Sequence, residues 1–65
     1  MDDATRKMIT EAYDETVSEA LAQGHPNDTA HKEGITAASM FLASMSGIED
    51  AAARAEVEKL GLEPT

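Results

Sequence analysis

The 65-residue chain contains no cysteine and no tryptophan, and Tyr13 and Phe41 are its two aromatic residues. Disulfide bonds are therefore excluded as the staple that a chain of this size often needs. Basic residues are also scarce, because five Lys and Arg stand against thirteen Asp and Glu, for a net charge of −8. Direct binding to nucleic acid or to an anionic membrane is disfavoured, since both depend on clusters of Lys and Arg.

Long apolar runs are missing as well. The uncharged segment Gly34–Ile48 contains serines, a threonine and two glycines, and it is too short to span a bilayer. The N-terminal segment is acidic and amphipathic and lacks the apolar region of a signal peptide. We therefore expect a single cytoplasmic domain, 1–65, with no membrane contact.

Apolar residues recur at helical spacing in three segments of the chain. The first predicted helix covers about 3–23 and stops at Gly24, with Pro26 close behind. The second covers about 28–45. The third covers about 47–60 and begins at a capping box that Ser46 would form with Glu49.

Short connections between these segments favour an all-α fold, a small antiparallel three-helix bundle. A two-helix hairpin with a loose third segment is the alternative. Residues at helical spacing form the expected core face of the second helix. They are Ala30, Gly34, Ile35, Ala38, Phe41, Leu42 and Met45.

The opposite side of the second helix has no charge after Glu33. It carries Thr36, Ser39, Met40, Ala43 and Ser44. Small residues let another backbone approach closely and methionine adapts to irregular contacts, whereas the plainer interpretation is a neutral exposed surface. Because the core is small, we expect a homodimer to bury this side and complete the fold. Substituting Met40 with glutamate should then dissociate the dimer.

Acidic residues concentrate on the first helix. Each of the five basic residues follows an acidic residue at helical spacing. These pairs are Asp2–Arg6, Asp3–Lys7, Asp28–Lys32, Asp50–Arg54 and Glu56–Lys59. Of the remaining acids, Glu11, Asp14, Glu15 and Glu19 share the first helix, and three of them form a ladder with steps of about 6 Å. This acidic face either keeps the protein soluble or recognises a basic partner.

Catalytic patterns are absent from the sequence. Ser39, Ser44 and Ser46 lie far along the second helix from His25 and His31, so no serine has a base to activate it. The best metal candidate is the cluster of His25, Asp28, His31 and Glu33, but its spacing is not diagnostic of a metal site. We expect no enzyme activity, no cofactor and no metal.

These observations favour a small acidic helical module that regulates or inhibits a partner protein by occupying its surface. The alternative is an inhibitor that mimics nucleic acid and blocks a DNA- or RNA-binding protein. In size and charge the chain is similar to small acidic phage proteins of the anti-defence or anti-CRISPR type, and the similarity includes no motif. A structural or assembly subunit is the third interpretation.

Overall fold

The computed structural model describes residues 1–64 of the chain. It contains the helices α1 (Asp3–Ala22), α2 (Asn27–Ser46) and α3 (Asp50–Glu58), with no strand in the described range. The predicted all-α three-helix bundle is confirmed. Across residues 1–64, no helix combines the length and the apolar character needed to cross a membrane.

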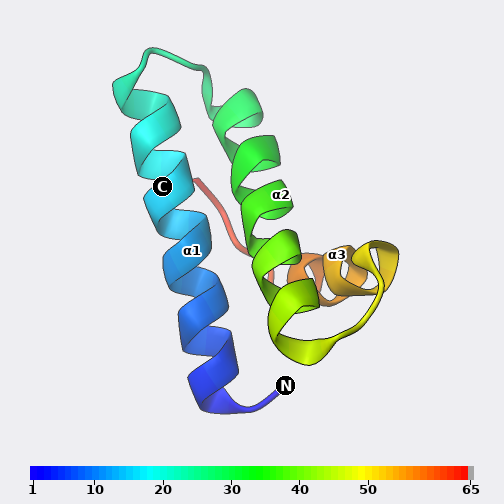
Figure 1. The fold of residues 1–65 in the computed structure, drawn as a ribbon. Helices are drawn as coiled ribbons and strands as arrows, with labels where there is room; N and C mark the ends of the chain where they lie inside the picture. Colours follow the sequence, from blue (N-terminus) through cyan, green and yellow to red (C-terminus); the bar gives the residue numbers. More distant parts are fainter. Residues whose placement is uncertain (65) are drawn as a thin grey trace.

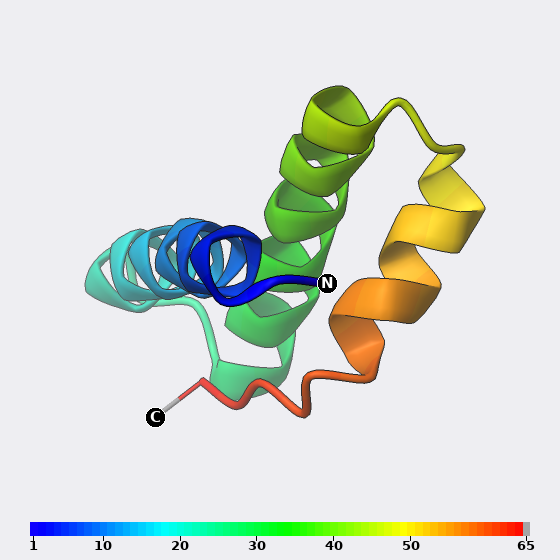
Figure 2. The same ribbon diagram turned by 90° about the horizontal axis from the view of Figure 1, so that it is seen from below.

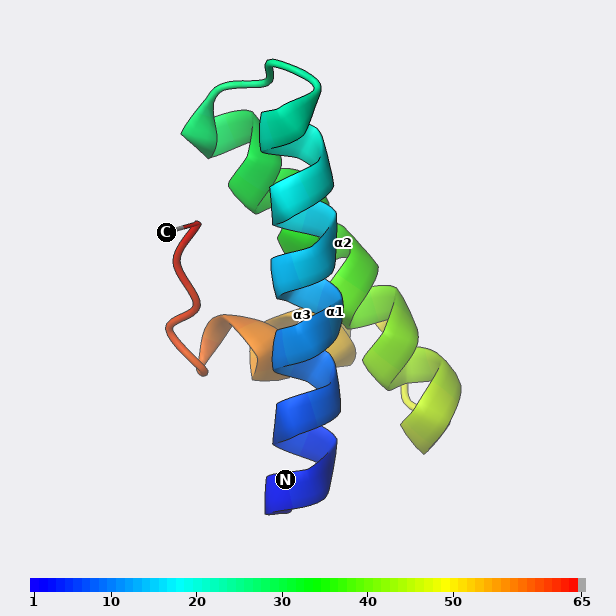
Figure 3. The same ribbon diagram turned by 90° about the vertical axis from the view of Figure 1, so that its left-hand side faces the viewer.

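α2 is the central helix of the bundle. It runs antiparallel to α1, and it lies between α1 and α3 (Figure 2). α3 crosses the pair instead of running alongside it (Figures 1 and 3). The C-terminal segment lies behind α1 and α2 in Figure 1, and α3 lies beside α2 on the flank away from α1 (Figure 2). The face of the α1–α2 pair that is turned to the viewer is therefore not covered by another segment of the described chain.

α1 begins at a side-chain cap. The Asp2 carboxylate accepts a hydrogen bond from the Thr5 backbone N–H at 2.8 Å, which satisfies one of the free donors at the helix start. Hydrogen bonds from the side chain and backbone of Thr5 lower the pKa of Asp2. The charged form of Asp2 is therefore the one that favours the folded helix.

The turn between α1 and α2 is a Schellman motif centred on Gly24. The His25 N–H donates to the Ala20 carbonyl at 3.1 Å, and the Gly24 N–H donates to the Leu21 carbonyl at 3.0 Å. Gly24 has a φ of 92°, a conformation that glycine adopts without strain. Pro26 then precedes α2 in an extended conformation. The predicted stop at Gly24 thus reverses the chain within a few residues.

The predicted capping box at the start of the third helix is wrong. Ser46 is the last residue of α2, and Gly47 ends that helix in the left-handed conformation with its N–H donating to the Ala43 carbonyl at 2.8 Å. Glu49 takes the N-cap position of α3 without a side-chain hydrogen bond, so α3 begins at Asp50 and not at residue 47. Ser46 and Gly47 could either start the third helix or end the second, and in the structure they end the second helix.

α1 and α2 approach each other closely at Gly34. A Cβ atom at this position would lie 2.7 Å from Cδ1 of Tyr13 and 2.7 Å from Cγ2 of Val17. The rest of the core consists of buried residues from all three helices, with Leu60 and Leu62 packed against it. They are Ile9, Tyr13, Val17, Ala20, Ala30, Ile35, Ala38, Leu42, Ala53 and Val57. The absence of a side chain at Gly34 lets the Tyr13 ring fill the space between the helices.

Candidate protein-binding face

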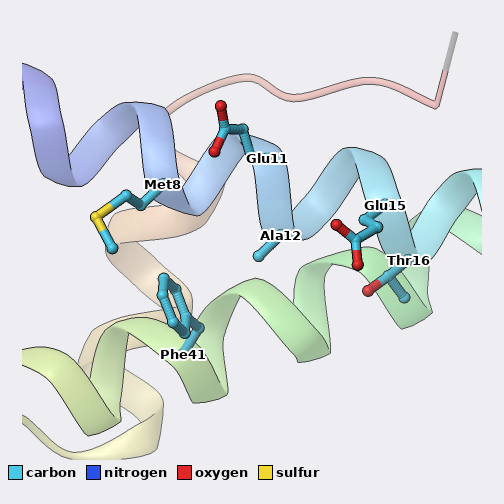
Figure 4. Close-up of a pocket in the computed structure, with 6 residues that line it drawn as sticks. All are labelled: Met8, Glu11, Ala12, Glu15, Thr16 and Phe41. Carbon is cyan, nitrogen blue, oxygen red and sulfur yellow. The ribbon is translucent and has the colours of Figure 1, made fainter.

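A hollow of about 340 Å³ opens between α1 and α2 on the uncovered face of the pair (Figure 4). Phe41 of α2 points toward α1 near Met8 and Ala12, and the Glu15 side chain lies over the gap between the helices. Six residues line the hollow: Met8, Glu11, Ala12, Glu15, Thr16 and Phe41. The hollow therefore has an apolar end at Met8 and Phe41 and an acidic side along α1.

A second hollow of about 190 Å³ continues along the same two helices. Its lining residues are Thr16, Glu19, Ala20, Gln23 and Glu33, so that Thr16 belongs to both hollows. We call the two hollows together the α1–α2 groove. At 1.5 Å per helical residue, the distance from Met8 to Gln23 is about 22 Å.

The charges that line the groove all have one sign. Its carboxylates are Glu11, Glu15, Glu19 and Glu33, and none of the five basic residues lines it. Within residues 1–64 the ion pair at 4.0 Å or less is Glu56–Lys59, at 3.3 Å. The other four acid–base pairs expected from the sequence are not formed. The groove therefore presents carboxylates that no base of the described chain neutralises.

Large apolar side chains are exposed at one end of the groove. Met8 is 43% exposed and Phe41 36%. Met45, one turn after Phe41 on α2, is 43% exposed, and Met40 is 63% exposed. The prediction that Phe41 and Met45 belong to the core is wrong. Both residues share the helix side of Gly34 and Ala38. They are exposed because they lie near the C-terminal end of α2, where this helix runs away from α1 (Figure 3).

The predicted self-association side of α2 is covered in part by the protein itself. Ser39 is 4% exposed and donates a hydrogen bond to the Ile35 carbonyl at 2.6 Å. Ala43 is partly buried against the core, and Thr36 accepts a hydrogen bond from Arg54 of α3 at 3.1 Å. Three of the five predicted residues are exposed, namely Thr36, Met40 and Ser44. Ser39 and Ala43 therefore do not belong to an open surface, and self-association through the other three residues stays a prediction.

The predicted acidic face is divided between two flanks of α1. Glu11, Glu15 and Glu19 line the groove, whereas Asp14 does not. Burial raises the pKa of Tyr13, and the charge of Asp14 adds to that effect. Sequence reasoning did not connect this ladder with Met8 and Phe41. Helical geometry offered part of the signal, because Met8 and Glu15 fall on neighbouring rows of the same helix flank.

His31 contacts the buried aromatic residue of α1. Its Nδ1 lies 2.6 Å from the Tyr13 hydroxyl, and the two rings meet edge to face. His25 is exposed in the turn. No group of three or more His, Asp or Glu within residues 1–64 is placed to hold a metal ion. His31 therefore has a structural contact, which satisfies one nitrogen of its ring.

Burial of Tyr13 predicts a loss of stability at alkaline pH. Burial, and then the charges of Asp14 and Glu63, raise the pKa of Tyr13 above its ordinary value of 10.0. This contribution is complete below the pKa of the unfolded chain and is lost as pH rises above it, because the unfolded state then ionises first. We expect the free energy of unfolding to fall more steeply above pH 10 in the parent than in Tyr13→Phe. Denaturation at a series of pH values measures the difference.

The same prediction has an optical check, because Tyr13 is the single tyrosine and the chain has no tryptophan. Phenolate absorbance of the folded protein should give a pKa above the ordinary one. Near neutral pH, Tyr13→Phe should cost about 1 kcal/mol for the lost hydrogen bond to His31. Equal slopes for parent and variant above pH 10 would contradict the assignment.

Comparison with protein-family models, with curated proteins and with solved structures gives no match for this chain. The groove and the charges that line it are therefore the basis for proposing a function.

Proposed function

We propose that this protein is a small acidic protein-binding module that regulates or inhibits a partner protein by occupying its surface, with the α1–α2 groove as the contact. The observation that supports this proposal is the exposed pair Met8 and Phe41 in a hollow whose charges are all negative. Exposed aromatic and methionine side chains are enriched at protein interfaces. A surface that served solubility alone would not need them in a concave position.

Substituting Phe41 with glutamate is expected to abolish capture of the partner. Phe41 is partly exposed, so the variant should keep its helix content while its apolar contact is replaced by a charge. A central aromatic anchor typically contributes 2 kcal/mol or more, so we expect recovery from a lysate to fall by about tenfold or more. Affinity capture followed by quantification of the recovered protein measures this loss.

The matched control is Ala52→Glu, which adds the same charge on the exposed side of α3. It should capture the partner as the parent does. If both variants recover the same proteins as the parent, the α1–α2 groove is not the binding surface.

A second candidate function is mimicry of nucleic acid, supported by the row of Glu11, Glu15 and Glu19, none of which forms an ion pair within residues 1–64. The partner would then be a nuclease, a polymerase or another protein with a basic channel. Its binding should weaken steeply between about 50 and 200 mM salt, and DNA or RNA should compete for it. Phe41→Glu should not weaken this binding, whereas it should abolish binding through the apolar contact. This difference separates the two candidates.

Homo-oligomer formation through Met40 and Ser44, and with it a role as an assembly subunit, stays a separate proposal. Met40 has the most exposed large apolar side chain of the described residues. Sedimentation of the parent and of a Met40→Glu variant distinguishes a dimer from a monomer. A parent that sediments as a monomer would remove this proposal without affecting the groove.

A further inference from the structure

We infer that the α1–α2 groove receives an amphipathic helix of the partner, with an apolar stripe on one side and Lys or Arg residues on the adjoining flank. This inference rests on the proposed function and adds the chemistry of the partner to it. It follows from the shape of the groove, from its apolar end and from the sign of its charges.

The shape of the groove fits one helix. Its length of about 22 Å corresponds to roughly four helical turns. α3 lies on the flank of α2 away from α1 (Figure 2), and neither α3 nor the C-terminal segment passes in front of the groove in Figure 4. A partner helix laid along the groove would contact both α1 and α2, and it would complete a bundle around the pair.

The apolar end of the groove fits the stripe of such a helix. Phe41 and Met8 flank the hollow near Ala12, whose small side chain leaves room between them. A helix that binds in this way presents apolar residues at spacings of three and four. Methionine has an unbranched, flexible side chain that adapts to the residues it meets.

The negative charges of the groove indicate that the flank of the partner helix carries Lys or Arg. Glu11, Glu15 and Glu19 recur once per turn on α1, and Glu33 adds a carboxylate from α2. A helix with Lys or Arg at the same spacing would place one base near each turn of the ladder. A second copy of this chain fits poorly, because it brings its own four groove carboxylates and a net charge of −8.

A display library of random peptides of about 16 residues tests this inference without knowledge of the partner. The parent protein is the bait, and the selected sequences are read for apolar periodicity and for charge. We expect enrichment of peptides with an apolar stripe at helical spacing and a net positive charge. Binders that are neutral or acidic, binders without helical periodicity, or no enrichment at all would overturn the inference.

Two double variants then test whether the basic residues of a selected peptide contact the glutamates of the groove. Glu11→Gln combined with Glu15→Gln should weaken binding by about fivefold or more at low salt, since each exposed pair contributes up to about 1 kcal/mol. The same change should reduce the salt dependence of binding. The matched control is Glu58→Gln combined with Glu63→Gln, which removes two exposed charges away from the groove and should leave affinity unchanged. Equal effects of the two double variants would contradict docking in the groove.

The outcomes separate this inference from the proposed function. If capture from a lysate depends on Phe41 but the selected peptides are not basic helices, the inference fails and the binding module stands. If no capture depends on Phe41, the proposed function fails, and selected peptides would then report binding that the partner does not use.

Discussion

Gly34→Ala is expected to destabilise the protein, although the same change stabilises an isolated helix by about 1 kcal/mol. The new Cβ would lie 2.7 Å from both Tyr13 and Val17, well inside ordinary contact distance. Tyr13 is fully buried and cannot swing aside without disturbing its hydrogen bond to His31. Overpacking of this kind costs about 2 kcal/mol, and we expect the melting temperature to fall by roughly 10 °C.

A second substitution can show that the effect arises from contact. Val17→Ala removes Cγ2, one of the atoms that the new methyl group would meet. Gly34→Ala should therefore cost less in a Val17→Ala background than in the parent, and the two changes should be non-additive in a thermal or urea denaturation series. Stability equal to or above that of the parent for Gly34→Ala alone would show that the helices are not packed closely at this point.

Val57→Asp is expected to abolish cooperative folding. Val57 is fully buried, and with Ala53 it is one of the two buried residues through which α3 packs on the core. A carboxylate without a partner at this position costs several kcal/mol. The whole domain has only about 3–10 kcal/mol of stability if it follows the usual value per residue. Circular dichroism should show a loss of helix and a broad thermal transition.

Ala55→Asp provides the control for Val57→Asp, because Ala55 is exposed on the same helix and gains the same charge. This variant should melt close to the parent. If the two aspartate variants have similar melting curves, α3 does not contribute to the core in the way that the burial of Val57 indicates.

The hairpin of α1 and α2 was predictable from the sequence because its signals are local. Asp2 caps α1, and Gly24 with Pro26 stops it, so the observed bounds of α1 differ from the prediction by one residue at the C-terminal end. The start of α3 was not predictable in the same way. Ser46 and Gly47 each satisfied a different rule, and only the full structure decides which rule applies.

The predicted core face of α2 is confirmed at Ala30, Gly34, Ile35, Ala38 and Leu42, and the errors lie at Ser39, Phe41 and Met45. α2 packs against both α1 and α3, so it buries more of its circumference than a helix with one neighbour. The sequence pattern predicts burial of only one apolar face. Ser39 looked like a surface residue because it is polar, but its hydroxyl bonds to a carbonyl of its own helix and needs no water. Phe41 looked like a core residue because it is large and apolar.

The candidate groove was predictable only in its parts. The ladder of Glu11, Glu15 and Glu19 is visible in the sequence as a charge pattern. Its place beside Phe41 depends on how α1 and α2 are rotated about their axes, which Gly34 and Tyr13 fix through tertiary contact. Periodicity within one helix indicates its buried face, but not which residues of the neighbouring helix lie beside a given residue.

The central position of α2 also determines the order in which the chain comes apart. α1 and α3 each pack on α2 and hardly on each other. Opening of α3 therefore leaves the antiparallel pair in place, whereas any fluctuation that removes α2 dismantles the whole molecule. Amide hydrogens in the middle of α2 should thus be the slowest to exchange with solvent, and those of the nine-residue α3 should be the fastest among the helical ones.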